Sequence, residues 1–140
     1  MAKSYCTFTL GEHLLGVDVS HVQEVIRRAE VTRVPLAPPI VAGVTSLRGQ
    51  IVTVVEARRL LALPDRAPEL VPAHLVLKTP RGMVSMLVDG VGDVLSPAES
   101  SFESLPEHVL PQIADVLSGV SKLEDTLLLL IDSERIFSLI

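Results

Sequence analysis

The residues best suited to nucleophilic catalysis are Asp18, Ser20 and His21, which are near neighbours in the chain. A catalytic triad needs a hydroxyl activated by an imidazole that a third group orients, and these groups meet in space rather than in sequence. Gln23 follows Ser20 by three positions, which is the capping-box spacing at the start of a helix. We therefore expect Ser20 to cap a short helical turn, and we expect no catalytic residue in this chain.

Metal and phosphate ligands are equally sparse. Cys6 has no partner cysteine, and the four histidines share no ligand spacing. The stretch Asp89–Asp93 resembles a glycine-rich phosphate loop but lacks the third glycine of that motif. Its two aspartates offer too few oxygen ligands for a hard cation. We expect neither a metal nor a cofactor. The histidines are His13, His21, His74 and His108.

Composition narrows the class of protein further. The 140 residues are 48% hydrophobic and 21% charged, which predicts one globular domain, while aromatic residues make up only 3%. The longest apolar run, Leu127–Ile131, is far shorter than the roughly 20 residues of a membrane span. The net charge of −5 and the few aromatic side chains argue against a nucleic-acid partner. The N-terminal residues lack an apolar signal core, and the single cysteine cannot form an intramolecular disulfide. Together with the short apolar runs, these features predict a cytoplasmic protein without direct membrane insertion.

Aliphatic stretches between turn residues predict a mainly β fold with a few short helices. Short helices are expected over 56–63 and after Asp132, and a one-turn helix over 40–42 after Pro39. Residues 96–111 are expected to form a loop or a short helix. The unbroken apolar run at 51–55 predicts a strand buried on both faces. The other predicted strands cover residues 5–10, 14–19, 44–47, 74–78, 83–88, 91–95, 114–123 and 126–131.

The two halves of the chain resemble each other. A shift of 76 residues places 41–47 on 117–123, 51–55 on 127–131 and Glu56 on Asp132. A different shift matches Gly16-Val17-Asp18 with Leu87-Val88-Asp89. The repeat predicts two small β-barrels related by a pseudo-two-fold axis, built from halves at about 5–63 and 73–139 within a single domain spanning 1–140. Terminal strands are free to cross between the barrels.

The halves differ in charge. Residues 1–81 carry ten basic and seven acidic groups, a balance of +3, whereas 82–140 carry two basic and ten acidic groups, a balance of −8. The turn Arg48-Gly49 falls on Glu124-Asp125 in the repeat. A cationic end on one half and an acidic end on the other predict head-to-tail binding, with charge setting the orientation.

Several motifs resemble those of the CheW family of chemotaxis coupling proteins. Residues 40–52, IVAGVTSLRGQIV, are similar to the family signature G-V-x-N-L-R-G-x-I-x-P. Val17-Asp18-Val19 and Val22-Gln23-Glu24-Val25 are similar to its N-terminal region, and Val88-Asp89-Gly90-Val91 to its second half. The resemblance covers residues 5–139 and rests on the order and spacing of several motifs.

This resemblance implies a non-enzymatic adaptor made of two five-stranded, SH3-like barrels. The implied partners are the cytoplasmic tip of methyl-accepting chemoreceptors and the regulatory domain of a CheA-like histidine kinase, in arrays at the membrane. It implies a receptor contact through the V-x-E stretch and the L-R-G turn, and assigns no kinase-binding residue. The receptor-binding residues carried over by motif are Val22, Glu24, Gly43 and Arg48, with Ile26 and Leu47 as apolar neighbours.

The sequence departs from the family pattern at three places. Ser46 replaces the usual Asn, Thr53 replaces the usual Pro, and Glu56 stands where an Asp normally begins a helix. These departures concern receptor affinity or partner choice rather than the fold. A scaffold for surface motility or gene control, or a small ligand-binding barrel, remains an alternative.

Overall fold

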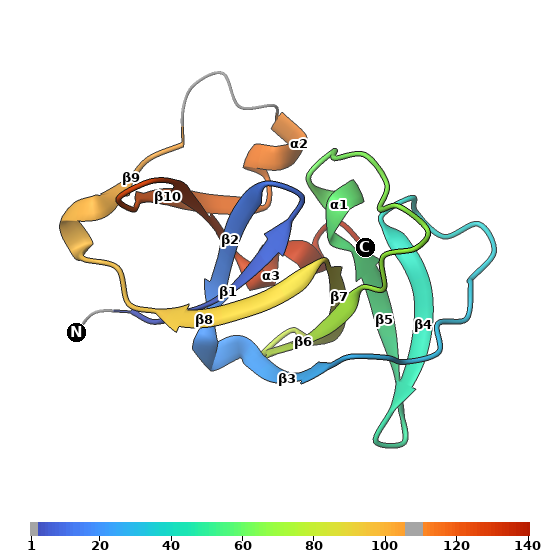
Figure 1. Cartoon of the computed structure of the whole chain (residues 1–140). Helices are drawn as coiled ribbons and strands as arrows, with labels where there is room; N and C mark the ends of the chain where they lie inside the picture. Colours follow the sequence, from blue (N-terminus) through green and yellow to red (C-terminus); the bar gives the residue numbers. More distant parts are fainter. Residues whose placement is uncertain (1–2, 106–110) are drawn as a thin grey trace.

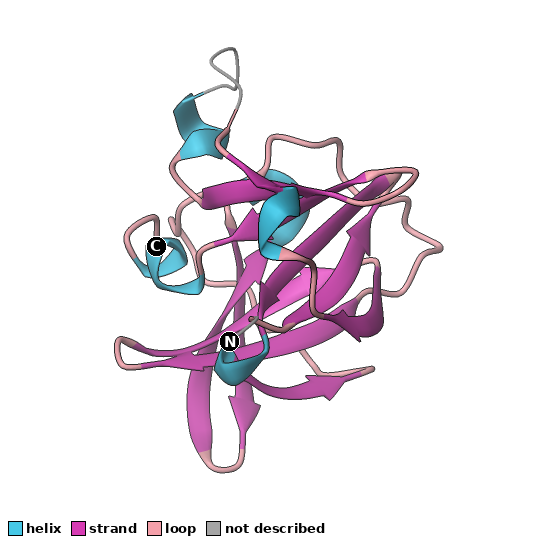
Figure 2. Ribbon diagram, turned by 90° about the vertical axis from the view of Figure 1, so that its left-hand side faces the viewer, coloured by secondary structure: helices cyan, strands magenta, loops and turns pink. Residues whose placement is uncertain are grey.

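We describe the fold from a computed structural model, in which residues 3–105 and 111–140 are placed well enough to describe. The described chain is mainly β, with two sheets and a few short helices at their periphery (Figures 1 and 2), which confirms that part of the predicted fold class. His108 and residues 106–110 of the expected loop lie outside the described residues. The strands are β1 (Tyr5–Leu10), β2 (His13–Asp18), β3 (Val22–Ile26), β4 (Val41–Leu47), β5 (Gln50–Glu56), β6 (Ala73–Thr79), β7 (Gly82–Val88), β8 (Gly90–Leu95), β9 (Phe102–Glu103), β10 (Leu117–Lys122) and β11 (Leu127–Ile131). The helices are η1 (Val19–His21), α1 (Ala57–Leu60), η2 (Glu99–Ser101), α2 (Pro111–Ala114) and α3 (Ser133–Phe137).

The strands form two sheets that each contain strands from both halves of the chain. Sheet A has the order β8-β1-β2-β11-β10-β9, and sheet B has the order β3-β6-β7-β5-β4. In both sheets most neighbours are antiparallel, and the parallel pairs are β2 with β11 and β5 with β7. Thus β3, from the first half of the chain, pairs with β6 from the second half, and β8, from the second half, pairs with β1 from the first.

The predicted repeat is visible in the geometry of two hairpins. In the β4–β5 hairpin the register shifts between Val41 and Gly43, and in the β10–β11 hairpin it shifts between Leu117 and Gly119, at the positions that the 76-residue shift superposes. A helix follows each hairpin. Glu56 and Asp132 cap these helices by accepting a hydrogen bond from the backbone N–H two residues on. The repeat therefore extends from the sequence to bulges and helix caps.

The pairings of the described residues do not show closed barrels. Sheet A has six strands rather than five, with β8 and β9 at its edges. The edges of sheet B are β3 and β4. Beyond β3, Thr32 forms one isolated bridge with Val44 of β4, in which the two residues exchange backbone hydrogen bonds of 2.8 Å. A single bridge brings the chain beyond β3 to the opposite edge of the sheet, and the barrel description stays unconfirmed.

One continuous aliphatic core lies between the two sheets. Sheet A contributes Phe8, Leu15 and Val17, and sheet B contributes Leu75 and Met86, all fully buried. Because side chains from both sheets pack together, the two sheets share one hydrophobic core.

Several local predictions were wrong. Ala114, predicted to begin a strand, is the last residue of helix α2. The carboxylate of Asp18, rather than the hydroxyl of Ser20, caps η1, because it accepts hydrogen bonds from both the backbone and the hydroxyl of Ser20. The expected helix over 40–42 is replaced by a turn and the start of β4 at Val41. Ile51 is 73% exposed although its run was predicted to be buried, since the strand register places it close to the β4–β5 turn. This end of the hairpin projects from the rest of the molecule (Figure 1).

Candidate functional site

Two predicted receptor-binding residues, one on β3 and one in the β4–β5 turn, meet on the surface of sheet B. The guanidinium of Arg48 donates through Nε and Nη2 to the two carboxylate oxygens of Glu24, both at 3.1 Å. The Arg48 side chain is 71% exposed and that of Glu24 is 25% exposed. Hydrogen bonds from Arg48 lower the pKa of Glu24. A bidentate pair has a defined orientation, so it presents both charges in a fixed geometry.

The turn between β4 and β5 explains why Arg48 is held. Leu47 pairs with Gln50, which leaves Arg48 and Gly49 as a two-residue loop. Both have positive φ, 51° and 79°, as the mirror-image hairpin turns require. Arg48 therefore occupies the left-handed region, which is unfavourable for a residue with a side chain. This conformation aims its guanidinium back toward Glu24 on β3.

A small apolar cluster lies next to this ion pair. Leu47 is 8% exposed and packs with Val52 and Val76, and Ile26 and Met83 cover the cluster from the side. Ile26 and Leu47, predicted as apolar neighbours of the charged pair, thus pack in one cluster. Glu24 pairs with Val76 of this cluster in the sheet, and Arg48 directly follows Leu47, so the charged pair borders a buried apolar cluster.

Gly43 and Val22 are placed differently from the other four predicted residues. Gly43 is buried in β4, and a Cβ at this position would lie 2.2 Å from the carbonyl oxygen of Thr32. Its lack of a side chain is therefore what permits the Thr32–Val44 bridge. Val22 is half-buried against the main core. Neither residue contributes to the exposed surface around Arg48.

Sequence reasoning missed Val25, which is 44% exposed. Along β3 the half-buried Val22, Glu24 and Ile26 alternate with exposed Gln23 and Val25. Val25 lines a groove of about 430 Å³ that we call the β3–β8 groove. The period-two alternation was the signal that could have found it. The groove is lined by Val25, Arg27, Arg28, Val71, Pro72, Ala73, Asp89, Gly90 and Val91.

A second group missed by the sequence reasoning is a cluster of four charges, which we call the Asp89 cluster. Arg66 donates to Glu56 at 2.9 and 3.1 Å and to Asp89 at 2.7 Å, while Arg58 donates to both Asp89 oxygens. The side chains are 6–16% exposed. Burial alone would raise the pKa of Asp89, but hydrogen bonds from Arg58, Gly11 and Arg66 lower it far below its usual range. Asp89, considered above as an unlikely metal ligand, is an ion-pair partner.

The groups first considered for catalysis do not assemble into a triad. Ser20 donates its hydroxyl to Asp18 at 2.8 Å, whereas Nδ1 of His21 lies 3.1 Å from the hydroxyl of Ser133. The serine and the histidine are therefore engaged with different partners. Among residues 3–105 and 111–140, there is also no group of three or more His, Cys, Asp or Glu side chains that could hold a metal ion.

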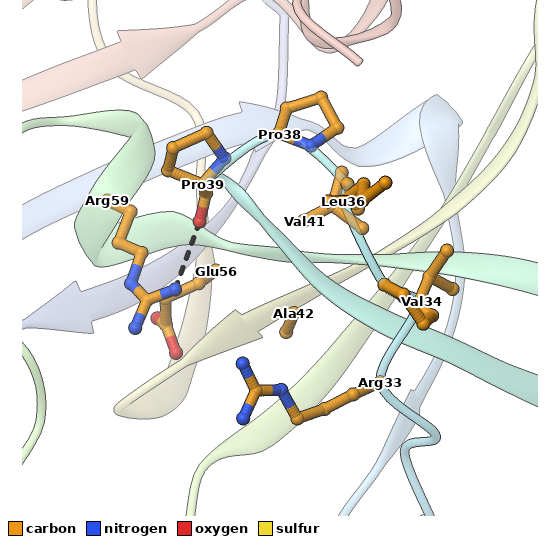
Figure 3. Close-up of a pocket in the computed structure, with 11 residues that line it drawn as sticks. Arg33, Val34, Leu36, Pro38, Pro39, Val41, Ala42, Glu56 and Arg59 are labelled. Atoms are coloured by element: carbon orange, nitrogen blue, oxygen red, sulfur yellow. Dashed lines mark hydrogen bonds between the residues drawn. The ribbon is translucent and has the colours of Figure 1, made fainter.

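A separate pocket of about 700 Å³ lies beneath the proline-rich loop between β3 and β4 (Figure 3). Leu36 is fully exposed on this loop with a φ of 62°, and Val34 is 42% exposed. Arg59 anchors the loop by donating to the carbonyl of Pro39 at 3.0 Å. The pocket contains none of the residues predicted to bind a receptor.

In the described part of the chain, no helix is long and apolar enough to cross a membrane.

Comparison with known proteins places this arrangement in context. Residues 4–140 match the family model of the CheW-like domain. The chain is similar to the chemotaxis protein CheW of Klebsiella aerogenes, with 32% identity over 138 residues, covering 99% of this chain and 83% of that protein. It is also similar to the chemotaxis protein CheW of Treponema pallidum, with 24% identity, covering 94% of this chain and 80% of that protein.

The fold has a solved counterpart. The crystal structure of the scaffolding protein TtCheW from Thermoanaerobacter tengcongensis superposes with a TM-score of 0.84 at 26% identity. The superposition covers 94% of this chain and 90% of that protein.

Proposed function

This chain belongs to the CheW family of chemotaxis scaffold proteins, and we propose that it is a non-enzymatic adaptor that couples methyl-accepting chemoreceptors to a CheA-like histidine kinase. We place it in the cytoplasm, recruited to receptor arrays at the membrane, with no nucleic-acid partner. The observation that carries the proposal is the bidentate Glu24–Arg48 pair. The two motifs that the family resemblance links to receptor binding contribute one charge each to this single exposed site.

The receptor contact that we propose is a helical hairpin that lies along the edge strand β3, with the charged pair on one face of this strand and the β3–β8 groove on the other. An amphipathic helix binds a groove through apolar side chains at helical spacing. Val25 and Val91 are 44% and 37% exposed, and both line this groove with Arg27 and Arg28. The aliphatic surface supplies contact area, and the arginines favour a helix that carries carboxylates along its edge. On binding, Arg48 forms an ion pair with a receptor carboxylate, either in place of its pair with Glu24 or in addition to it.

The kinase contact that we propose relies on the charge difference between the halves. Residues 1–81 carry a balance of +3 and 82–140 a balance of −8. A homologous regulatory domain with the same asymmetry would bind head to tail, and such heterologous contacts form rings or chains. Charge then sets orientation and encounter rate, while aliphatic contacts supply most of the affinity.

Two titrations test the proposal. The labelled protein is titrated with a receptor fragment comprising the cytoplasmic hairpin, and separately with the kinase regulatory domain, at low and high salt. We expect saturable binding to both, and weaker kinase binding at high salt because ions screen exposed charges. Binding to neither would refute the adaptor function. Kinase affinity that stays constant across the salt range would refute the electrostatic part alone.

A second pathway fits the same site. A CheW-like scaffold that serves surface motility or gene control would use the same surface with a different receptor. The three departures at Ser46, Thr53 and Glu56 favour keeping this alternative. Capture from the native cytosol distinguishes the two pathways by the receptor that is recovered with the kinase.

A further inference from the structure

Asp89 occupies the position where the chain passes from one sheet to the other. It is the single residue between β7, which ends at Val88 in sheet B, and β8, which begins at Gly90 in sheet A. Its backbone N–H donates to the carbonyl of Thr9 at 3.0 Å, and its carboxylate accepts from the backbone N–H of Gly11 at 2.7 Å. Both partners belong to the β1–β2 hairpin of sheet A, so Asp89 is fixed to that sheet.

The cations that bind Asp89 come from the side of sheet B. Arg58 lies on α1, directly after β5, and Arg66 lies in the proline-flanked connector before β6. Arg66 also binds Glu56 at the end of β5 through two nitrogens. Its side chain is 6% exposed, the lowest value in the cluster. Arg66 therefore links a carboxylate of sheet B to the carboxylate at the crossing point.

The repeat offers an internal comparison. Asp18, which aligns with Asp89, lies at the other crossing, where the chain leaves β2 in sheet A for β3 in sheet B. Its carboxylate accepts from the backbone and hydroxyl of Ser20, two residues away, and so stabilises only a local turn. The two crossings are thus braced differently: one by a local cap and one by a cluster that spans both sheets.

This difference bears on the β3–β8 groove. Asp89 itself lines the groove, and Val91 follows it by two residues on β8. Val25 lines the same groove from β3, which belongs to sheet B. The groove width therefore depends on how the two sheets are placed at Asp89. Aliphatic packing is non-directional and tolerates small displacements, whereas charge-assisted hydrogen bonds fix distance and angle.

We propose that Arg66 is a positioning residue that holds Asp89 against Glu56 and thereby sets the spacing between β3 and β8. The aliphatic core keeps the sheets folded together, and the Asp89 cluster fixes their relative placement at the groove. Only the consequence for receptor binding rests on the proposed function. The spacing itself is a property of the free protein.

Distances between spin labels in the free protein test this proposal. In a Cys6→Ala background, cysteines replace Val25 and Val91 to report across the groove, or Val25 and Ile51 to report within sheet B. Arg66→Gln removes the charge and keeps most of the side-chain length. Arg59→Gln is the matched control, because Arg59 pairs with Asp65 in the same connector at a site where both side chains are exposed.

We expect Arg66→Gln to shift or broaden the 25–91 distance by more than about 2 Å, the scale of a genuine rearrangement, and to leave the 25–51 distance unchanged. Arg59→Gln should change neither distance. An unchanged 25–91 distance in folded Arg66→Gln protein would overturn the proposal, as would equal broadening of both distances. If circular dichroism shows that Arg66→Gln does not fold, Asp89→Asn decides the question by the same criteria, since it retains an acceptor for Gly11.

Discussion

Glu24 and Arg48 lie 24 residues apart in the chain, yet they form one bidentate ion pair on the surface of sheet B. Neither residue packs in the main core, and the Arg48 side chain is 71% exposed. An exposed pair contributes little to the stability of a fold. The left-handed backbone at Arg48 is unfavourable by itself. The pair therefore contributes little to stability, in keeping with the receptor-binding role that we propose for it.

Reversal of charge at this pair should separate receptor binding from kinase binding. We expect Arg48→Glu to weaken receptor binding by at least about tenfold, since a desolvated charge that loses its partner weakens binding strongly. Kinase binding should change less than about threefold, because the kinase contact that we propose depends on the charge balance of both halves, to which Arg48 contributes only one of many charges. The measurement is a titration of each partner, with circular dichroism as the check on folding.

The double variant Glu24→Arg, Arg48→Glu is the matched control for that experiment. It restores an ion pair of reversed direction and therefore retains the local geometry. If the receptor contacts the individual charges, the double variant should still bind the receptor weakly. Full recovery of receptor affinity would mean that only the structural role of the pair matters. If Arg48→Glu weakened receptor binding and kinase binding equally, the assignment of Arg48 to the receptor contact would be contradicted.

Gly43 should be far less tolerant of substitution than its repeat equivalent Gly119. An alanine Cβ at 43 would lie 2.2 Å from the Thr32 carbonyl, whereas at 119 it would lie 3.1 Å from the Glu103 carbonyl. We expect Gly43→Ala to lower the free energy of unfolding by about 1–3 kcal/mol, the scale of local backbone strain, and Gly119→Ala to cost less. Urea unfolding measures both, and a larger loss at 119 would refute this explanation.

His74 should make stability depend on pH in the range where histidine titrates. It is 4% exposed on β6, with Nδ1 lying 3.1 Å from the Ser85 hydroxyl, and burial lowers its pKa. The folded state therefore disfavours the charged form. The unfolded chain takes up a proton first, so stability is full above about pH 6.5 and falls as the pH drops below that value.

The variant His74→Gln isolates this contribution. It can retain a hydrogen bond to Ser85 but has no group that titrates. We expect the free energy of unfolding of the unmodified protein to decrease from about pH 8 to about pH 5.5, and that of the variant to decrease less over this range. Parallel pH profiles would show that His74 does not carry the effect.

The sequence predicted the elements where hydrophobic pattern and repeat agree. The 76-residue shift aligned Glu56 with Asp132, and both cap a short helix after a bulged hairpin. Turn chemistry located the tight turn at Arg48-Gly49. These features depend on residues close together in the chain, which is why local reasoning found them.

Long-range features were harder to predict. Arg66 lies in a connector rich in proline, where a charged side chain is expected to be exposed to solvent. Its side chain is nevertheless only 6% exposed, because it forms ion pairs with both Glu56 and Asp89. The exchange of β3 and β8 between halves leaves no mark on the periodicity of either strand. Val25 and Glu24 are adjacent in sequence but point to opposite faces of β3. A family motif that contains Glu24 therefore does not predict which surface Val25 lines.

The central claim is that this protein joins a receptor to a kinase, and co-sedimentation tests it most directly. Vesicles displaying receptor cytoplasmic fragments are mixed with the histidine kinase, with or without this protein, and the kinase in the pellet is measured. We predict that the protein brings the kinase into the pellet and that Arg48→Glu reduces this recruitment by at least about tenfold. Equal amounts of kinase in the pellet with and without the protein would contradict the account.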